Sequence, residues 1–287
     1  MQVITYPTAA DFLAATQSFL EEDEVLHSLV LGVCMHLARR PEPPKKTPYL
    51  AAVWPGERPA LAAMMIPPRN LVLAPMAGMN ERALVALAAD LQAGEWSVPG
   101  VQAPVPTARR FAAIWCERQR CTFQRIRHLG ILALEEVLPP RPASGHLRQA
   151  TPADLPLATR WLITFQQEAL PEEKESPEQL AAAIRQVVES GRLFLWEDQE
   201  PVSMVAKSRP TRHGISINMV YTPPEHRGRG YASNAVAQLS QALLEEGYRF
   251  CTLFVDLANP VSTKIYRTIG YRPVAEVEVY RFEALGG

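Results

Sequence analysis

Two stretches of this chain carry the same pattern of residues in the same order. The segment 8–16 reads Thr-Ala-Ala-Asp-Phe-Leu-Ala-Ala-Thr, and the segment 151–159 reads Thr-Pro-Ala-Asp-Leu-Pro-Leu-Ala-Thr. A repeat constrains the fold strongly, because each copy must build the same unit. The chain is therefore predicted to contain an internal duplication. Two further matches support it: Trp54 and Pro59 with Trp196 and Pro201, and segment 104–107 with segment 260–263.

The segment 138–145, Leu-Pro-Pro-Arg-Pro-Ala-Ser-Gly, lies between the two copies. Its prolines stiffen the backbone, and it has neither strand nor helix periodicity, which is typical of a linker. The predicted units are residues 1–137 and residues 146–287. A chain of 287 residues is long enough to build a core in each.

In the second unit an apolar strand runs into a loop rich in glycine and arginine, and a helix follows at once. The strand is Ile215–Val220, the loop carries Arg227-Gly228-Arg229-Gly230, and the helix begins at Tyr231. Glycines let the loop expose consecutive backbone N–H groups, and the helix start adds unpaired donors and a positive dipole end. Such a turn attracts phosphate, and two arginines reinforce it. We interpret it as a pyrophosphate-binding loop, with a basic surface turn as the alternative.

The first unit lacks this loop. The offset between the copies grows from 142 to 156 residues between Pro59 and Pro104, so fourteen residues are missing there. The corresponding stretch, Leu73–Asn80, contains no arginine and no Gly-x-Gly. The first unit is therefore predicted to keep the fold and to have lost the phosphate site.

Residue periodicity predicts the elements of the second unit. Thr151 and Asn259 are expected to cap helices, and Gly247 and Gly270 to end them. The last helix is expected to bury the stripe Val261, Ile265 and Ile269. The predicted strands are 147–150, 193–197, 202–208, 215–220, 251–255 and 274–282, and the predicted helices are 152–168, 177–190, 231–246 and one beginning at residue 260.

Composition narrows the class of protein. The formal net charge of −1 argues against nucleic acid as a partner. The N-terminus lacks a basic region followed by an apolar run, and no run of about 18 apolar residues occurs, so a cytoplasmic protein without a membrane span is expected. The four cysteines are scattered and the histidines show no His-x-x-x-His pairing, so buried reduced thiols and no metal are expected.

Arginines concentrate at the end of the first unit. No stacking aromatics alternate regularly with them, so a solvated face or a contact between units is favoured over a nucleic-acid patch. These arginines are Arg109, Arg110, Arg118, Arg120, Arg125 and Arg127.

The second unit resembles the GNAT superfamily of acyl-CoA-dependent N-acyltransferases. Arg227-Gly228-Arg229-Gly230-Tyr231-Ala232 fits the family pattern Gln/Arg-x-x-Gly-x-Gly/Ala, and Asn259, Tyr266, Gly270 and Tyr271 fit its second motif. The resemblance covers residues 146–283, and the first unit looks like a degenerate copy. It implies an α+β protein of two tandem GNAT-like domains, each a twisted, mixed, mostly antiparallel sheet flanked by helices.

The resemblance also implies the roles of individual residues. The loop Arg227–Ala232 would bind the pyrophosphate of acetyl-CoA, and the backbone of Val220, next to Met219, would pair with the pantetheine arm. The strands holding Met219–Val220 and Leu253–Val255 would splay apart to admit the thioester. Asn259 would contact the cofactor.

Tyr266 would be the general acid. A tyrosine near pKa 10 can protonate a thiolate whose thiol has a pKa near 8.5. The alternative is a packing residue, although its position beside the expected apolar stripe predicts that it points away from the core.

The general base is less defined. Glu168 is a candidate for relaying the proton of a cationic amine or orienting it; a solvated helix end beside Glu172–Glu175 is the alternative. Asn218 is expected to line the pocket. The expected function is N-acetyl transfer from acetyl-CoA to an amine of a small molecule or peptide. The alternative is a non-catalytic acyl-CoA-binding regulatory module. The sequence identifies neither the acceptor nor the oligomeric state.

Overall fold

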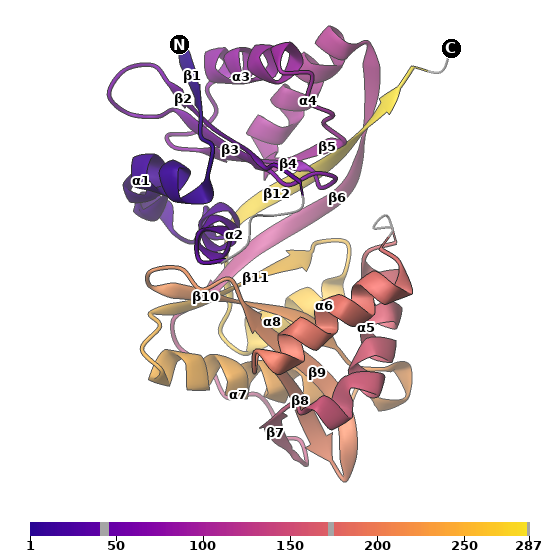
Figure 1. Ribbon diagram of the computed structural model, residues 1–287. Helices are drawn as coiled ribbons and strands as arrows, with labels where there is room; N and C mark the ends of the chain where they lie inside the picture. Colours follow the sequence, from indigo (N-terminus) through magenta and orange to yellow (C-terminus); the bar gives the residue numbers. More distant parts are fainter. Residues whose placement is uncertain (41–45, 172–174, 286–287) are drawn as a thin grey trace.

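The computed structural model describes residues 1–40, 46–171 and 175–285 and shows a single mixed sheet with helices on both faces (Figure 1). The sheet has twelve strands in the order β1-β2-β3-β4-β5-β12-β6-β11-β10-β9-β8-β7. The α+β class expected from the sequence is therefore confirmed. Among the described residues, no helix is long and apolar enough to cross a membrane.

The two halves of the chain have the same order of strands and α-helices. The first half contains β1 (Gln2–Thr5), α1 (Ala9–Leu20), α2 (Ser28–Ala38), β2 (Tyr49–Trp54), β3 (Leu61–Met65), β4 (Leu71–Pro75), α3 (Glu81–Ala93), β5 (Gly100–Pro104), α4 (Val105–Gln119) and β6 (Cys121–Leu134). The second contains β7 (His146–Gln149), α5 (Leu155–Ala169), α6 (Pro177–Glu189), β8 (Leu193–Asp198), β9 (Glu200–Ser208), β10 (Gly214–Tyr221), α7 (Tyr231–Glu245), β11 (Phe250–Asp256), α8 (Pro260–Thr268) and β12 (Arg272–Ala284).

The residues that first indicated a duplication occupy equivalent places. Thr8 caps α1, and Thr151 caps the short 3₁₀ turn that leads into α5. Trp54 ends β2, and Trp196 lies in its counterpart β8. The internal duplication is therefore confirmed.

The halves exchange their last strands. β6 and β12 pair with each other along most of their length, and each also pairs with the fifth strand of the other half, β6 with β11 and β12 with β5. Figure 1 shows these two long strands running between the halves. Because the strand exchange joins both halves in one sheet, the sheet itself does not mark a boundary between them. The division into residues 1–137, a linker 138–145 and residues 146–287 therefore remains a prediction from the sequence.

The helices form two layers, one on each face of the sheet. α3 and α4 pack on one face of the first half, and α7 and α8 on the same face of the second. α1 and α2 pack on the opposite face, as do α5 and α6. In α7 the residues Val236, Leu239 and Leu243 are buried and pack in the cluster with the strands.

The expectation of reduced cysteines is wrong for two of them. Cys116 and Cys121 form a disulfide with their Cα atoms 4.5 Å apart. The intervening Arg120 has a left-handed backbone, φ +52°, which ends α4 and turns the chain back into β6. A turn of this kind brings together cysteines that are five residues apart, although their spacing alone fits no disulfide motif. Cys34 and Cys251 are buried thiols, as expected.

Candidate active site

The strands β10 and β11 separate part-way along their length. They pair in parallel only from Gly214–Ser216 to Phe250–Thr252. Beyond this point β10 bulges against β9 between Asn218 and Tyr221, and Met219 has a left-handed φ of +50°. The splaying that the resemblance implied is therefore present, and the β10 edge that faces β11 lacks a partner strand among the described residues.

The second part of the loop after β10 presents backbone N–H groups that have no hydrogen-bond partner among the described residues. Gly228 and Gly230 have φ values of +79° and +83°, which L side chains rarely adopt. Within the described chain, the N–H groups of residues 228–233 donate no hydrogen bond. Gly230 is the N-cap of the fifteen-residue helix α7 and supplies no side-chain cap. Six consecutive unpaired donors at the positive end of a helix are an arrangement that can bind an anion.

The counterpart helix in the first half is capped differently. Asn80 is the N-cap of α3, and its Oδ1 accepts a hydrogen bond from the Ala83 N–H at 3.1 Å. A side-chain oxygen thus occupies the start of α3, where α7 leaves the donors free. This contrast supports the prediction that only the second half binds phosphate.

Arg227 is held in place beside the loop. Its Nε donates to the Thr222 carbonyl oxygen at 2.8 Å, and its guanidinium lies 5.8 Å from the centre of the Tyr221 ring. Its Nη2 donates to Oε2 of Glu168 at 2.6 Å. The structure therefore brings Glu168, from the last turn of α5, to the phosphate loop. Both side chains are more than 40% exposed, so the pair contributes at most about 1 kcal/mol.

Tyr266 is buried, contrary to the expectation that it points away from the core. It is 9% exposed and packs in the cluster beneath α7 and α8, whereas Val261 is 67% exposed. Of the expected buried stripe, Ile269, the C-cap of α8, is fully buried and Ile265 packs against the same cluster, whereas Val261 is exposed. The expectation is therefore wrong for Val261, and Tyr266 is buried instead. Burial raises the pKa of Tyr266 to about 12, so the hydroxyl stays protonated at neutral pH.

Comparison with known proteins decides the family of the second half. Residues 158–271 match the family model described as "Acetyltransferase (GNAT) family". This part of the chain is a GNAT domain. The match includes the phosphate loop, α7, β11 and α8. No curated protein matches the sequence.

Solved structures show that the tandem arrangement extends over the whole chain. A "Tandem GNAT protein from the clavulanic acid biosynthesis pathway" is 16% identical, with a TM-score of 0.58 over 100% of this chain and 99% of that one. An acetyltransferase from the GNAT family of Colwellia psychrerythraea is 10% identical, with a TM-score of 0.62 over 99% and 100%. A GCN5-related N-acetyltransferase from Sphaerobacter thermophilus is 16% identical, with a TM-score of 0.64 over 97% and 95%. At these identities the likeness shows the fold alone.

The remaining cofactor-binding candidates of the GNAT domain lie around the loop and the gap. Arg229 is exposed, and Ala232 is half-buried in the first turn of α7. The Tyr231 side chain is buried and its hydroxyl donates to Asp198 at 2.6 Å, so only its N–H faces the loop. Asn259 caps α8 by accepting from the Ser262 N–H at 3.1 Å, which leaves its side-chain NH₂ for a ligand. Met219 and Val220 are half-buried at the gap.

The acidic stretch after α5 is only partly described. Glu172, Glu173 and Lys174 lie outside the described residues. Glu175 accepts a hydrogen bond from Arg69 of the first half at 2.6 Å. This contact had no signal in the sequence, since it joins residues 106 positions apart.

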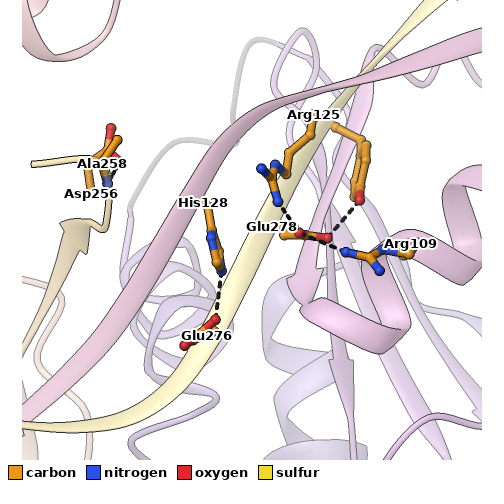
Figure 2. Close-up of polar contacts among 8 residues, drawn as sticks. Arg109, Arg125, His128, Asp256, Ala258, Glu276 and Glu278 are labelled. Atoms are coloured by element: carbon orange, nitrogen blue, oxygen red, sulfur yellow. Dashed lines mark hydrogen bonds and ion pairs between the residues drawn. The ribbon is translucent and has the colours of Figure 1, made fainter.

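A polar cluster lies where β6 and β12 pair, between α4 and α8 (Figure 2). Glu278 is 1% exposed, accepts from Arg109 at 3.2 Å and from Arg125 at 2.8 Å, and receives the Tyr280 hydroxyl at 2.7 Å. These hydrogen bonds hold the pKa of Glu278 below its usual value, although burial alone would raise it. Because β12 comes from the second half, the interpretation of these two arginines as a contact between halves is confirmed.

Sequence reasoning singled out Asn218 but overlooked Arg209 and Glu24. Asn218 Oδ1 is buried in β10 with no hydrogen-bond partner, close to where the strands part. Arg209 follows β9, and its Nε is likewise buried without a partner. Glu24 binds His213 across the halves. Only a fold that packs the first half against the β9–β10 turn reveals the last two.

Proposed function

We propose that the second half transfers an acetyl group from acetyl-CoA to an amine of a small molecule or peptide. The observation that carries the proposal is the row of unpaired N–H groups at residues 228–233 at the start of α7. A diphosphate accepts hydrogen bonds from such a row, and Arg227 and Arg229 add positive charge. The GNAT family in general uses acyl-CoA donors, which fits this site.

The thioester is proposed to bind in the gap between β10 and β11. The unpaired edge of Ile217–Val220 can hydrogen-bond the amide groups of a pantetheine arm as a neighbouring strand would. The loop begins where β10 ends, so an arm anchored at residues 228–233 runs back along that edge. Binding donor and acceptor on opposite sides of the gap supplies much of the acceleration through positioning.

The reaction requires two proton movements. A neutral amine attacks the thioester carbonyl, the new C–N bond forms, the C–S bond breaks, and the amine loses one proton while the sulfur gains one. We assign Tyr266 as the donor of the proton that the sulfur gains. Donation from a tyrosine of pKa about 12 to a thiolate in water costs about 5 kcal/mol. The cost falls at a buried site, because the same burial raises the pKa of the thiol.

Glu168 is proposed to accept the proton that the amine loses. Its carboxylate is bound to Arg227. It therefore accepts the proton through a bridging water, or directly once Arg227 has released it to bind the diphosphate. Calorimetric titration with CoA, followed by a thiol-release assay with acetyl-CoA over a panel of amines, tests the proposal. Micromolar CoA binding that requires the loop, with acceptor-dependent thiol release, is the expected result.

A non-catalytic acyl-CoA-binding module is the second candidate. The engagement of Glu168 by Arg227 favours it, because this carboxylate is not free to accept a proton in this conformation. Tight CoA binding without thiol release over the whole amine panel would select this candidate. Failure of CoA to bind would exclude both.

A further inference from the structure

Arg209 places an uncompensated positive charge inside the protein. It follows β9, its side chain is half-buried, and its Nε is shielded from solvent without a hydrogen-bond partner. Across the described part of the chain it forms no ion pair. Its guanidinium carbon lies 5.8 Å from the centre of the Phe254 ring. Burial lowers the pKa of Arg209 to about 10, so the group remains a cation at neutral pH.

Phe254 locates this charge near the gap between β10 and β11. Ile215, Ile217, Leu253 and Val255 lie in the cluster under α7 and α8. Because side chains alternate along a strand, Ser216, Asn218, Thr252 and Phe254 lie on the opposite face. The Ser216 and Thr252 hydroxyls, 3.0 Å apart, mark the last paired position of the strands. Asn218 and Phe254 are the next residues on that face, where the strands diverge.

Among the described residues, no carboxylate forms an ion pair with Arg209. The segment of the first half that covers this region carries Glu21 and Glu24, and both are already bound. Glu24 accepts from the His213 N–H at 2.7 Å and contacts its Nδ1 at 2.8 Å. Glu21 accepts from Arg212 at 3.2 Å. A buried charge without a partner costs free energy, so it is retained where a ligand completes it.

The position of Arg209 is fixed by the backbone. Its φ of +48° departs from strand geometry and breaks the alternation that would direct its side chain toward α7. Helix α2 passes so close that a Cβ on Gly32 would lie 2.6 Å from the Arg209 Cβ and 2.9 Å from its carbonyl oxygen. Glycine at position 32 therefore makes room for this conformation. A strained, preorganised cation is typical of a binding site.

We infer that Arg209, together with the side-chain amide of Asn218, binds a carboxylate of the acceptor, so that the acceptor is an amine that also carries a carboxylate. This inference rests on the proposed function. The donor approaches along α7, so an acceptor enters from the face that holds Asn218 and Phe254. Arginine forms paired N–H hydrogen bonds with a planar carboxylate, which fits a group whose donors are otherwise unused. The Asn218 amide supplies a further polar contact beside it.

The test uses the full chain saturated with CoA and a set of N-acetylated amino acids, each matched with its carboxamide. These are product mimics that differ only in the charge of one group, and calorimetric titration gives both affinities. Wild-type protein is expected to bind the carboxylates about 10- to 100-fold more tightly than the amides, as expected for a charged hydrogen bond. In Arg209→Gln this preference is expected to disappear. Arg212→Gln is the control, because Arg212 lies three residues away and its side chain is 65% exposed. In this variant the preference for carboxylates is expected to remain.

Several outcomes would overturn the inference. They are equal binding of acids and amides to wild type, no binding of either, or a preference that survives Arg209→Gln. N-Acetylated aminoalkyl phosphates in the same titration would overturn the carboxylate assignment if they bound more tightly than the acids. Asn218→Ala provides a second variant, with an expected three- to tenfold loss for the acids alone. CoA affinity, measured first in every variant, reports separately on the proposed function.

Thermal unfolding adds a readout that a purely structural arginine would not give. Because Arg209 is buried without a counter-ion, Arg209→Gln is expected to raise the Tm by a few degrees. A structural arginine would lower it on removal.

Discussion

Oε2 of Glu168 lies 2.6 Å from Nη2 of Arg227, so the proposed base and the proposed phosphate ligand are bound to each other. The diphosphate and the Glu168 carboxylate compete for one guanidinium. Glu168→Gln is therefore expected to tighten CoA binding, by up to about fivefold, since an exposed pair contributes at most about 1 kcal/mol. Arg227→Gln is expected to weaken it. Calorimetry at low and high salt measures both effects, and weaker CoA binding in Glu168→Gln would contradict the competition.

The same variant tests Glu168 as a base. If it relays the amine proton, Glu168→Gln lowers kcat by about 10²- to 10⁴-fold although CoA binds at least as well. Glu175→Gln is a matched control, because the Glu175 carboxylate pairs with Arg69 instead of Arg227. This variant is expected to leave kcat unchanged. An unchanged kcat in Glu168→Gln would remove this residue from the mechanism.

The glycine at the start of α7 permits a second test. Gly230→Ala places a side chain on a backbone with φ +83°, which costs about 1–2 kcal/mol and shifts the N–H groups of the first turn. CoA affinity is expected to fall about tenfold or more. Gly247→Ala imposes the same kind of strain, φ +105°, just beyond the other end of this helix, and should leave CoA affinity unchanged. Equal losses in the two variants would show that helix stability, not the loop, sets the affinity.

Tyr266→Phe removes the hydroxyl and keeps the buried ring. If Tyr266 protonates the sulfur, kcat falls by about 10²-fold or more while the KM for acetyl-CoA changes little. The protonated form of Tyr266 is the active one, and the pKa of Tyr266, about 12, lies above the ordinary tyrosine value of 10. The loss of kcat that an ordinary tyrosine would cause near pH 10 should therefore be absent from the wild-type profile. Full activity in Tyr266→Phe would assign Tyr266 to packing alone.

Local sequence signals predicted most of the second half, because they act over a few residues. Gly247 and Asn259 mark helix ends by backbone and side-chain rules that need no tertiary context, and both lie where expected. Ile265 and Ile269 pack as expected, but the exposure of Val261 and the burial of Tyr266 were not predicted, since they depend on how α8 packs against the rest of the fold. The strand exchange was also missed. Either half could have closed its own sheet with β6 or β12, and only the packing of both selects the crossed arrangement.

The contact between Glu24 and His213, which also joins the two halves, was not predicted for the same reason, and it can be tested. Glu24 is 8% exposed and accepts from the backbone N–H of His213 at 2.7 Å. Burial alone would raise its pKa, but hydrogen bonds from the His213 backbone, Thr211 and the His213 ring hold it below the ordinary 4.5. A lowered pKa stabilises the fold above the unfolded value near 4.5, and the contribution is lost as pH falls through the folded value.

Glu24→Gln should therefore lower the Tm at pH 7, and the difference from wild type should shrink as the pH is lowered below about 4. A hydrogen bond to a charged group contributes about 1.5–3 kcal/mol, and each kcal/mol shifts the Tm by about 2–4 °C in a protein of 150–250 residues. A fall of about 3–12 °C is expected. Glu22→Gln, at a 51% exposed carboxylate two residues away, should change the Tm by less than about 2 °C. A difference that stayed constant from pH 7 to pH 3 would show that the Glu24 charge does not hold the halves together.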